Sequence, residues 1–377
     1  MGNNLSRLAQ ALAKLSVPLE DVFLIQNILR DTSALIPGDI WGHDPYNIFA
    51  YLYEQKEDGI GGKALFDRNV VSRVVALARG RVLPQNSESA KSYRLSAACL
   101  AFCILAEIEV EPGMASYELA SVKGHAEAAE ELVDFVFADN VHPQFFADIA
   151  LGRIDRIPRI HLNEIRADRN IAAIKLPAAS LEKTILPWYH SYLHVLKAVS
   201  LLRGNLNPIQ SAEAWLRWQA DEAFLNASAS LYCLAALSRS DLSSGMIKSG
   251  NSKHPSRLRH GVRNATWDIA YVSQWARSVI DEPCLKWLFA SCDGALKTIA
   301  QAILINEEDD FEAKMLEFLV PYWGRGSAGV LCGVYSDLEK RSRDVRGRRQ
   351  TLPDHFNSNH EASIRQLEID LGIAGVV

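Results

Sequence analysis

Two short apolar runs in this chain have the length and the flanks of buried β-strands, and a helical segment follows each of them. The first run, Lys63–Phe66, comes after a glycine-rich turn and stops at Asp67. The second run, Cys284–Ser291, stops just before Asp293. Strand, acid and helix in this order are typical of an open α/β sheet, which places its ligands at the carboxyl ends of its strands. The two runs therefore predict a sheet with an acidic edge.

Most of the remaining sequence is predicted to be helical. Apolar residues recur with helical spacing from residue 5 to about residue 57, and again from about residue 126 to residue 240. We therefore expect an α/β fold in which a parallel sheet core carries extensive added α-helical layers. The expected organisation comprises an N-terminal helical segment (1–60), a core in two pieces (61–125 and 255–305), a helical insertion (126–254) and a C-terminal helical and basic tail (306–377).

The overall charge limits the partners that the chain as a whole can attract. Its 377 residues include 40 basic and 45 acidic side chains, which gives a net charge of −5. Because no global positive field attracts nucleic acid, such a partner requires local basic patches. Apolar residues make up 48% of the chain, which excludes a largely disordered protein. No stretch approaches the length of apolar sequence that spans a bilayer, so we expect no membrane partner.

The scattered cysteines favour a reducing compartment. Cys99 and Cys103 are four residues apart in a strongly apolar helical segment, and this spacing suits core packing better than a disulfide. No CxxC pair or Cys/His cluster has the spacing of a zinc site. We therefore expect a cytoplasmic protein with free cysteines.

Four acidic residues stand at positions from which they can meet at one sheet edge. Asp67 and Asp293 follow the predicted strands, while Glu118 lies inside a predicted helix and Asp268 is expected to open another. Carboxylates alone form the oxygen-only shell that Mg²⁺ and Mn²⁺ prefer. Each acid also has a plain structural alternative. Asp67 and Asp268 would cap helices, Asp293 would form a turn, and Glu118 would lie on a solvated helix face.

The sequences around these acids, taken in order, resemble those of the PIN-domain ribonucleases. The matching segments are LFDRN, ASYELA, NATWDIAYVSQWA and LFASCDGALKTIA. The resemblance implies a PIN-like parallel sheet and a metal-dependent endoribonuclease that hydrolyses RNA phosphodiester bonds with one or two Mg²⁺ or Mn²⁺ ions. The implied catalytic and metal-binding residues are Asp67, Glu118, Asp268 and Asp293. The implied supporting residues, which orient the acids, are Asn69 and Ser291.

The sequence departs from the family's pattern at two points. The interval between Glu118 and Asp268 is far longer than in compact members, and Arg68 stands where a small residue or threonine is usual. Because of the long interval, the second acid has the alternatives Glu111, Glu131 and Glu222. By analogy, the helical insertion suggests regulation or substrate selection in a toxin or phage-defence setting, with an inhibitory or regulatory protein partner.

Two basic segments are candidates for RNA contact. The segment from about residue 241 to residue 264 is rich in serine, glycine and basic residues, and we expect it to be an exposed loop. Its basic residues are Lys253, His254, Arg257, Arg259, His260 and Arg263. They form either a phosphate-contacting rim beside the acidic site or a solvated linker. The second stretch, Arg341–Arg349, forms either another such rim or a disordered tail.

For the histidines and tryptophans in the helical regions, we favour structural roles over metal binding or base stacking. His190 and His194 have the i,i+4 spacing of metal ligands, but the sequence shows no third ligand, so we expect them to pack or to form hydrogen bonds. Helical spacing favours the core over a base-stacking surface for Trp188, Trp215, Trp218, Trp267 and Trp275.

Two rival functions remain open at the level of sequence. Arg349 and His355 fit an Arg-x₅-His spacing of the metal-independent HEPN ribonucleases, although Pro353 lies between them. Alternatively, the chain is a non-enzymatic helical scaffold or interaction protein in which all of the acids are structural. RNA cleavage in the presence and absence of EDTA separates these readings, because HEPN chemistry survives the chelator and a scaffold cleaves nothing.

Overall fold

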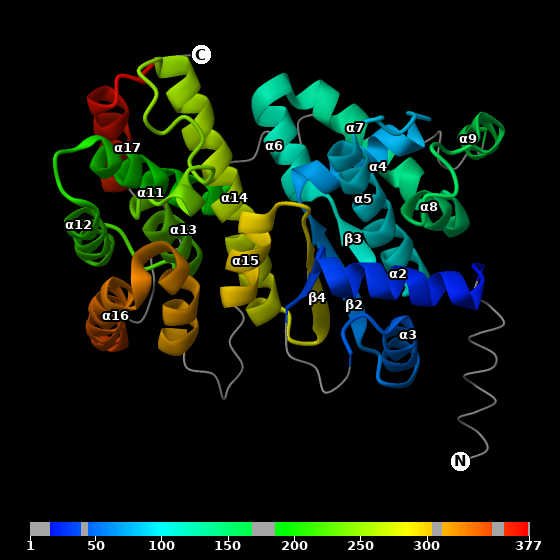
Figure 1. The fold of residues 1–377 in the computed structure, drawn as a ribbon, viewed down its shortest axis with the longest axis horizontal. Helices are drawn as coiled ribbons and strands as arrows, with labels where there is room; N and C mark the ends of the chain where they lie inside the picture. The colour runs from blue at the N-terminus through cyan, green and yellow to red at the C-terminus, as the bar shows by residue number, and fades with distance from the viewer. Residues whose placement is uncertain (1–15, 39–43, 168–184, 304–310, 349–357, 376–377) are drawn as a thin grey trace. The chain divides into compact units, whose positions relative to one another are not determined.

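The protein, described by a computed structural model, folds into two compact units (Figure 1). The structure describes residues 16–38, 44–167, 185–303, 311–348 and 358–375. Unit 1 comprises residues 1–183 and 277–297, and unit 2 comprises residues 184–276 and 298–377. Two helices, α14 (Pro255–Asp281) and α15 (Gly294–Ile303), contribute residues to both units.

Unit 1 is an α/β unit with a four-stranded sheet. Its elements are α2 (Leu19–Thr32), β1 (Leu35–Pro37), α3 (Ile48–Glu57), β2 (Gly61–Phe66), α4 (Arg68–Ala78), α5 (Ser87–Leu105), β3 (Glu109–Glu111), α6 (Gly113–Lys123), α7 (His125–Asp139), α8 (Pro143–Ala150), α9 (Arg159–Arg166) and β4 (Leu285–Ala290). The predicted core piece 61–125 lies within this unit, whereas the piece 255–305 is divided between the two units.

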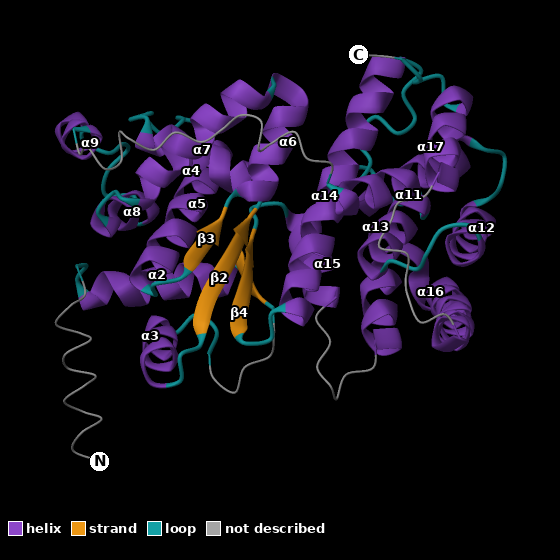
Figure 2. Ribbon diagram, turned by 180° about the vertical axis from the view of Figure 1, so that it is seen from behind, coloured by secondary structure: helices purple, strands orange, loops and turns teal. Residues whose placement is uncertain are grey.

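The two predicted strands are parallel neighbours in the sheet. The strand order is β1-β4-β2-β3, and Figure 2 shows β2 between β3 and β4. β2 runs parallel to both of its neighbours, with Phe66 opposite Ala290, whereas β1 runs antiparallel to β4. The expectation that the strands ending near Asp67 and Asp293 share one sheet and one direction is confirmed.

Helices bury the apolar ends of the two central strands. Ala64, Leu65 and Phe66 are all buried, as is the end of β4, so these strands carry continuous rather than alternating apolar sequence. α5 packs against α2, α4 and α8, and α4 also packs against α7. Phe66 and Phe102 belong to the resulting hydrophobic core. The helix-dominated α/β architecture that the sequence predicts is confirmed.

Two edge strands, β1 and β3, are absent from the sequence prediction. Each has three residues, which is too short for a periodic apolar pattern. Their composition suits sheet edges: β1 ends at Pro37, which has no N–H to donate, and β3 exposes Glu109 and Glu111. The sequence predicts a parallel sheet core, whereas the observed sheet is mixed, because β1 runs antiparallel to β4.

All of the secondary-structure elements in the described part of unit 2 are helices. Besides parts of α14 and α15, its elements are α11 (Leu186–Arg203), α12 (Pro208–Asp221), α13 (Ala227–Leu237), the short 3₁₀ helix η2 (Asp241–Ser243), α16 (Phe311–Arg348) and α17 (Ser358–Asp370). Large aromatic side chains fill its interior, among them Trp215, Tyr232 and Trp275. The prediction that Trp267 and Trp275 are core residues is confirmed, since their side chains are 4% and 0% exposed.

The predicted loop from about residue 241 to residue 264 is wrong over its second half. α14 already begins at Pro255, so Arg257, Arg259 and Arg263 lie on a helix. Proline is favoured at a helix start, because its missing N–H has no intrahelical partner there. Asp268 consequently lies inside α14 and does not open it, so its predicted role as a helix cap is also wrong.

Gly324 interrupts α16 in the C-terminal region. Its φ of 69° and ψ of 157° are non-helical, so two helical segments join there, within the glycine-rich stretch from Trp323 to Gly329. Residues other than glycine rarely adopt such a φ. A single glycine thus separates the two helical segments of α16.

The cysteines agree with the prediction. All six cysteines are free, and Cys99 and Cys103 are fully buried in α5, as their spacing predicts. In the described part of the chain, no helix has the length and apolarity needed to cross a membrane.

One glycine of unit 2 permits a close approach of backbone to helix. Gly261 lies in α14, and a Cβ atom added there would come within 1.6 Å of the carbonyl oxygen of Lys248. Only a residue without a side chain fits this position. By contrast, a Cβ added at Gly333, inside α16, meets no described neighbour within 4 Å.

We expect Gly261→Ala to destabilise the protein by at least about 2 kcal/mol, because the new methyl group overlaps a backbone atom. The matched variant Gly333→Ala should instead stabilise it by about 0.5–1 kcal/mol, because alanine is the better helix former. Urea unfolding followed by circular dichroism measures both free energies. Equal effects of the two substitutions would contradict the packing of α14 on residue 248.

Candidate functional site

Asp67 connects the end of β2 to the start of α4. Its backbone N–H donates to the carbonyl of Ala290 at 3.0 Å, which extends the pairing of β2 with β4 by one residue. Its Oδ1 accepts a hydrogen bond from the N–H of Val70 at 2.7 Å. The side chain therefore caps α4, which is the structural alternative that the sequence offered. Asp67 is also only 2% exposed, so this carboxyl group is almost entirely removed from water.

A single buried hydroxyl group joins the two aspartates. The Oγ of Ser291 donates to Oδ2 of Asp67 and accepts a hydrogen bond from the backbone N–H of Asp293 at 3.0 Å. The backbone N–H of Ser291 in turn donates to the carbonyl of Ala34, next to β1. Ser291 is fully buried, so neither hydrogen bond competes with solvent. The ends of three neighbouring strands are thus tied together at this point.

Asp293 is half-buried and stands at the start of α15. Its Oδ1 accepts hydrogen bonds from the N–H groups of Ala295 at 2.8 Å and Leu296 at 3.2 Å. Both aspartates therefore lie at helix N-termini, where the positive end of the helix dipole stabilises negative charge. The same location attracts other anions, including phosphate groups.

The burial of Asp67 makes it harder to ionise. Removal from water raises the pKa of Asp67 from 3.8 to about 6, against the opposing effects of the hydrogen bonds from Ser291 and Val70 and of the nearby charge of Arg73. The negative charge of Asp293 raises this pKa further. The two carboxylates are thus close enough to repel each other, which is a feature of sites that neutralise their charge with a bound cation.

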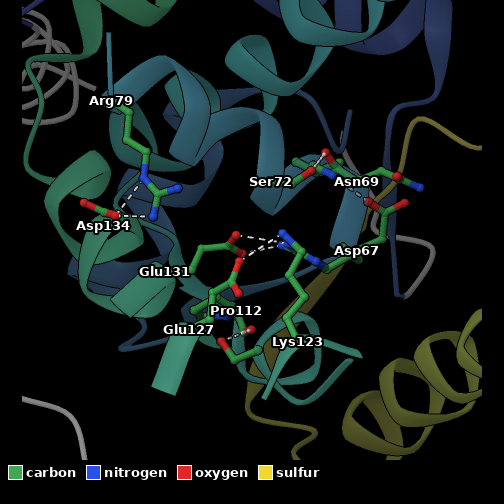
Figure 3. Close-up of polar contacts among 12 residues, drawn as sticks. Asp67, Asn69, Ser72, Arg79, Pro112, Lys123, Glu127, Glu131 and Asp134 are labelled. Atoms are coloured by element: carbon green, nitrogen blue, oxygen red, sulfur yellow. Dashed lines mark hydrogen bonds and ion pairs between the residues drawn. The ribbon is translucent and has the colours of Figure 1, made fainter. Parts of the chain in front are cut away.

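The other sequence candidates of unit 1 are placed differently. Glu118 is half-buried on α6, whereas Asn69 is exposed in the first turn of α4, where its backbone carbonyl accepts a hydrogen bond from Ser72 at 3.1 Å. Figure 3 shows Asn69 and Ser72 near Asp67. Among the alternatives for the second acid, Glu131 forms a two-point ion pair with Arg68, and Glu111 accepts from the N–H of Gly113.

The ion pair of Arg68 explains one departure from the PIN-like motif. Arg68 follows Asp67 directly, and its guanidinium reaches Glu131 on α7. Two further ion pairs, Arg79–Asp134 and Lys123–Glu127, lie in the same region (Figure 3). Arg68 therefore links α4 to α7 through its ion pair with Glu131, a residue that lies outside the PIN-like motifs.

Two of the sequence candidates belong to unit 2. Asp268 lies inside α14, where its Oδ2 accepts a hydrogen bond from the hydroxyl of Tyr232 on α13 at 3.2 Å. Glu222 ends α12 as its C-cap residue. Of the four predicted acids and the three alternatives for the second one, the structure brings Asp67 and Asp293 together within unit 1. Across the described residues, no group of three or more His, Cys, Asp or Glu side chains gathers as it would around a metal ion.

The donor set at the sheet edge fits a hard divalent cation. Asp67 and Asp293 offer carboxylate oxygens, and the capping hydrogen bonds of Asp293 use its Oδ1, which leaves Oδ2 for a ligand. Magnesium keeps several of its waters and is commonly bound through one or two carboxylates together with substrate phosphates. Asp67 and Asp293 are therefore the residues at this edge that could hold such an ion.

The histidine pair of α11 has a structural role. His194 is fully buried, and its two ring nitrogens lie 2.6 and 3.1 Å from the carbonyl oxygens of His190 and Phe224. Burial lowers the pKa of His194, which favours the uncharged ring. The prediction that these histidines pack and form hydrogen bonds is confirmed. Trp215 and Trp218, which contact the His194 ring, are core residues, as expected.

The predicted RNA-binding residues of unit 2 divide into two kinds. Lys253 and Arg257 are exposed, whereas Arg259 and Arg263 are half-buried. The guanidinium of Arg263 lies 5.8 Å from the ring centre of Trp188, and burial lowers its pKa. The second basic stretch, Arg341–Arg349, coincides with the end of α16. The HEPN-like pair consists of Arg349 and His355. Both members of that pair fall outside the described residues.

Sequence reasoning missed the residues of α5 that contact Cys292, the residue before Asp293. The Sγ of Cys292 lies 3.7 Å from the carbonyl oxygen of Ser92 and from Oγ of Ser96. Ser92 and Ser96 have i,i+4 spacing on one helix face, but nothing local relates them to a turn some two hundred positions later in the chain. Only the folded structure shows that these serines lie beside Cys292.

No family model, curated protein or solved structure matches this chain. The relation to the PIN-domain ribonucleases therefore rests on the four sequence motifs.

We expect Asp67→Asn to change how stability depends on pH. Because the pKa of Asp67 in the folded protein, about 6, lies above its ordinary value of 3.8, protonation of Asp67 favours folding. This contribution is complete below about pH 4 and is lost as the pH rises through 6. Relative to Asp67→Asn, the free energy of unfolding of the wild type should fall by up to about 3 kcal/mol between pH 4 and pH 7.5.

Urea unfolding in EDTA at several pH values measures this difference. Asp58→Asn, at an exposed position of the same unit, serves as the control and should show no such trend. A constant difference between wild type and Asp67→Asn across the pH range would contradict the burial of an ionisable Asp67.

Proposed function

We propose that unit 1 is a metal-dependent ribonuclease whose active site is the carboxyl edge of β2 and β4. The observation that supports it most is the pair of aspartates at adjacent strand ends, linked through the Ser291 hydroxyl. Asp67 and Asp293 come from opposite ends of the unit's sequence, yet their charges interact. The four PIN-like motifs give the proposed reaction, which is hydrolysis of RNA phosphodiester bonds.

The chain's own groups would orient the carboxylates and receive the substrate. Hydrogen bonds from Ser291 and from the N–H of Val70 hold both oxygens of Asp67, and the N-terminus of α15 holds Asp293. The first turns of α4 and α15 direct N–H groups toward the same edge, where they favour a bound phosphate. When bound, Mg²⁺ or Mn²⁺ supplies charge neutralisation at the phosphate and activation of water.

The proposed ligand set is confined to unit 1. It consists of Asp67 and Asp293, and the resemblance to PIN-domain ribonucleases adds Glu118 on α6. Asp268, which the resemblance also implies, belongs to unit 2 and accepts a hydrogen bond from Tyr232. Its contribution is tested separately, by substitution.

The proposed partners follow from the same resemblance. RNA is the substrate, and a toxin or phage-defence setting with an inhibitory or regulatory protein partner is the proposed context. In unit 2, Lys253 and Arg257 are exposed and remain candidates for RNA contact. Arg259 and Arg263 are half-buried near the aromatic side chains of α11, so their proposed contribution to RNA binding is smaller.

A helical scaffold is the second candidate function. It is favoured by the hydrogen bonds that make Asp67 and Asp293 the caps of α4 and α15. In this alternative, both carboxylates stabilise helix starts and bind no metal. The experiment below distinguishes the two functions, because a scaffold has no cleavage activity to lose.

We expect the purified protein to cleave RNA in Mg²⁺ or Mn²⁺ and to lose this activity in EDTA. Asp67→Asn and Asp293→Asn should each reduce the cleavage rate about a hundredfold or more, because each removes charge that the transition state requires. Gel-resolved cleavage of a labelled RNA measures the rates.

Asp58→Asn and Asp268→Asn are measured in parallel, and both should retain cleavage. Loss of activity in a folded Asp268→Asn protein would return Asp268 to the ligand set. Cleavage at the wild-type rate by Asp67→Asn would exclude the proposed site, and cleavage that persists in EDTA would favour the HEPN-type alternative.

A further inference from the structure

A groove lined with arginines lies on unit 1, outside the residues considered above. Its outer part is a hollow of about 870 Å³ at the loop between α8 and α9 and at one position of α5. The charged residues that line it are Arg94, Arg153, Asp155, Arg156 and Arg159. Four of these five side chains are guanidinium groups, although the chain as a whole has a net charge of −5.

The inner part of the groove is a hollow of about 510 Å³ between α4 and the first turns of α5. Two arginines, Arg73 and Arg81, line it together with Glu88 and Tyr93. Ser89 and Ser92 add hydroxyl groups that can donate hydrogen bonds to an anion. The guanidinium of Arg81 lies 5.9 Å from the ring centre of Tyr93, which places an aromatic ring beside the cations.

The two hollows involve consecutive residues of α5. Tyr93 lines the inner hollow and the next residue, Arg94, lines the outer one. The loop before α5 is joined to the loop before α9 by a hydrogen bond from the N–H of Leu83 to the carbonyl of Asp155, at 2.8 Å. Figure 1 shows α4, α5, α8 and α9 on the same side of the unit. We name this surface the arginine groove and define it by Arg73, Arg81, Arg94, Arg153, Arg156 and Arg159.

Most of these arginines are available for a ligand. Arg153 pairs with Asp21 and Asp148, and its charge is therefore largely balanced. Arg94, Arg156 and Arg159 are exposed, and none of them forms an ion pair among the described residues. Arg73 has a buried Nη1 that finds no hydrogen-bond partner in the described structure. This N–H group can therefore donate a hydrogen bond to an anionic ligand.

The inner end of the groove lies next to the candidate site. Ser92, which lines the groove, has its carbonyl oxygen 3.7 Å from Sγ of Cys292, between Ser291 and Asp293 in the chain. Arg73 acts on the opposite carboxylate, since its charge stabilises the ionised form of Asp67. The inner hollow is therefore connected to Asp293 through the contact of Ser92 with Cys292, and to Asp67 through the charge of Arg73.

We propose that the arginine groove binds the phosphate backbone of single-stranded RNA and leads it to Asp67 and Asp293. Arginine forks match phosphate oxygens, and guanidinium groups spread over α4, α5 and the segment between α8 and α9 fit a chain of phosphates better than one isolated anion. The Tyr93 ring offers a stacking surface for an unpaired base, which a duplex would not present. The final step to the aspartates rests on the proposed function, whereas the binding itself does not.

The test measures RNA binding without cleavage. Fluorescence anisotropy of a labelled single-stranded RNA is recorded with the Asp67→Asn protein in EDTA, over a range of salt concentrations. The test variant adds Arg94→Ala, Arg156→Ala and Arg159→Ala. We expect its affinity to fall at least tenfold, and the slope of log affinity against log salt to decrease by about two, as expected for three lost phosphate contacts.

A matched control removes the same charge elsewhere. Arg217, Arg325 and Arg365 are exposed residues of unit 2, and their triple alanine variant should keep the affinity and the slope nearly unchanged. If both triple variants weaken binding equally, general electrostatics explains the result and the groove is excluded. A double variant of Arg156 and Arg159 repeats the measurement if the triple variant does not fold.

This test distinguishes a failure of the arginine groove from a failure of the proposed ribonuclease function. If the wild type cleaves no RNA but the groove variant loses binding, the groove stands and the ribonuclease proposal fails. If cleavage depends on Asp67 but the groove variant binds RNA as the control does, the groove is overturned and the active site stands. Equal affinity for a duplex of the same sequence would overturn the assignment to single strands.

Discussion

The parallel pairing of β2 with β4 is the interaction on which the rest of unit 1 depends. It places Asp67 and Ser291 within hydrogen-bonding distance, and the N–H of Asp67 extends the ladder to Ala290. Parallel neighbours always require a crossover connection, and here the chain between β3 and β4 includes residues 184–276 of unit 2. The acidic edge therefore forms only when segments from distant parts of the chain have paired, which makes this sheet a high-contact-order structure.

The same hydrogen bonds stabilise the fold and position the carboxylates. Asp67 is buried, and its ionised form is tolerated because Val70, Ser291 and the charge of Arg73 offset part of the desolvation cost. A buried aspartate that served only as a cap would gain little from this arrangement, since an exposed cap gives comparable stabilisation without burial. The cost of burial is characteristic of sites whose geometry serves a ligand. The pH dependence of stability reports this cost independently of any activity.

The sequence predicted the elements whose signals are local. The short apolar runs before Asp67 and Asp293 predicted β2, β4 and their shared direction, and helical spacing predicted the buried tryptophans. β1 and β3 were not predicted, because a strand of three residues is too short to show a periodic pattern. The start of α14 was predicted too late in the chain, because its first turns, which begin at Pro255, are rich in the Ser, Gly and basic residues that are typical of loops. The contact of Cys292 with Ser92 could not be predicted, because only tertiary packing brings these residues together.

The distribution of positive charge shows the same limit of sequence reasoning, with a functional consequence. A run of basic residues, such as that around Arg257, is conspicuous in sequence, but Arg259 within it is half-buried and Arg263 lies against the Trp188 ring. The arginine groove, by contrast, is assembled from four separate segments, and no run announces it. Screening limits the reach of a charge to about 10 Å, so cations compensate an acidic edge only when they lie beside it. Arg73 meets this condition, because it lines the groove and acts directly on Asp67.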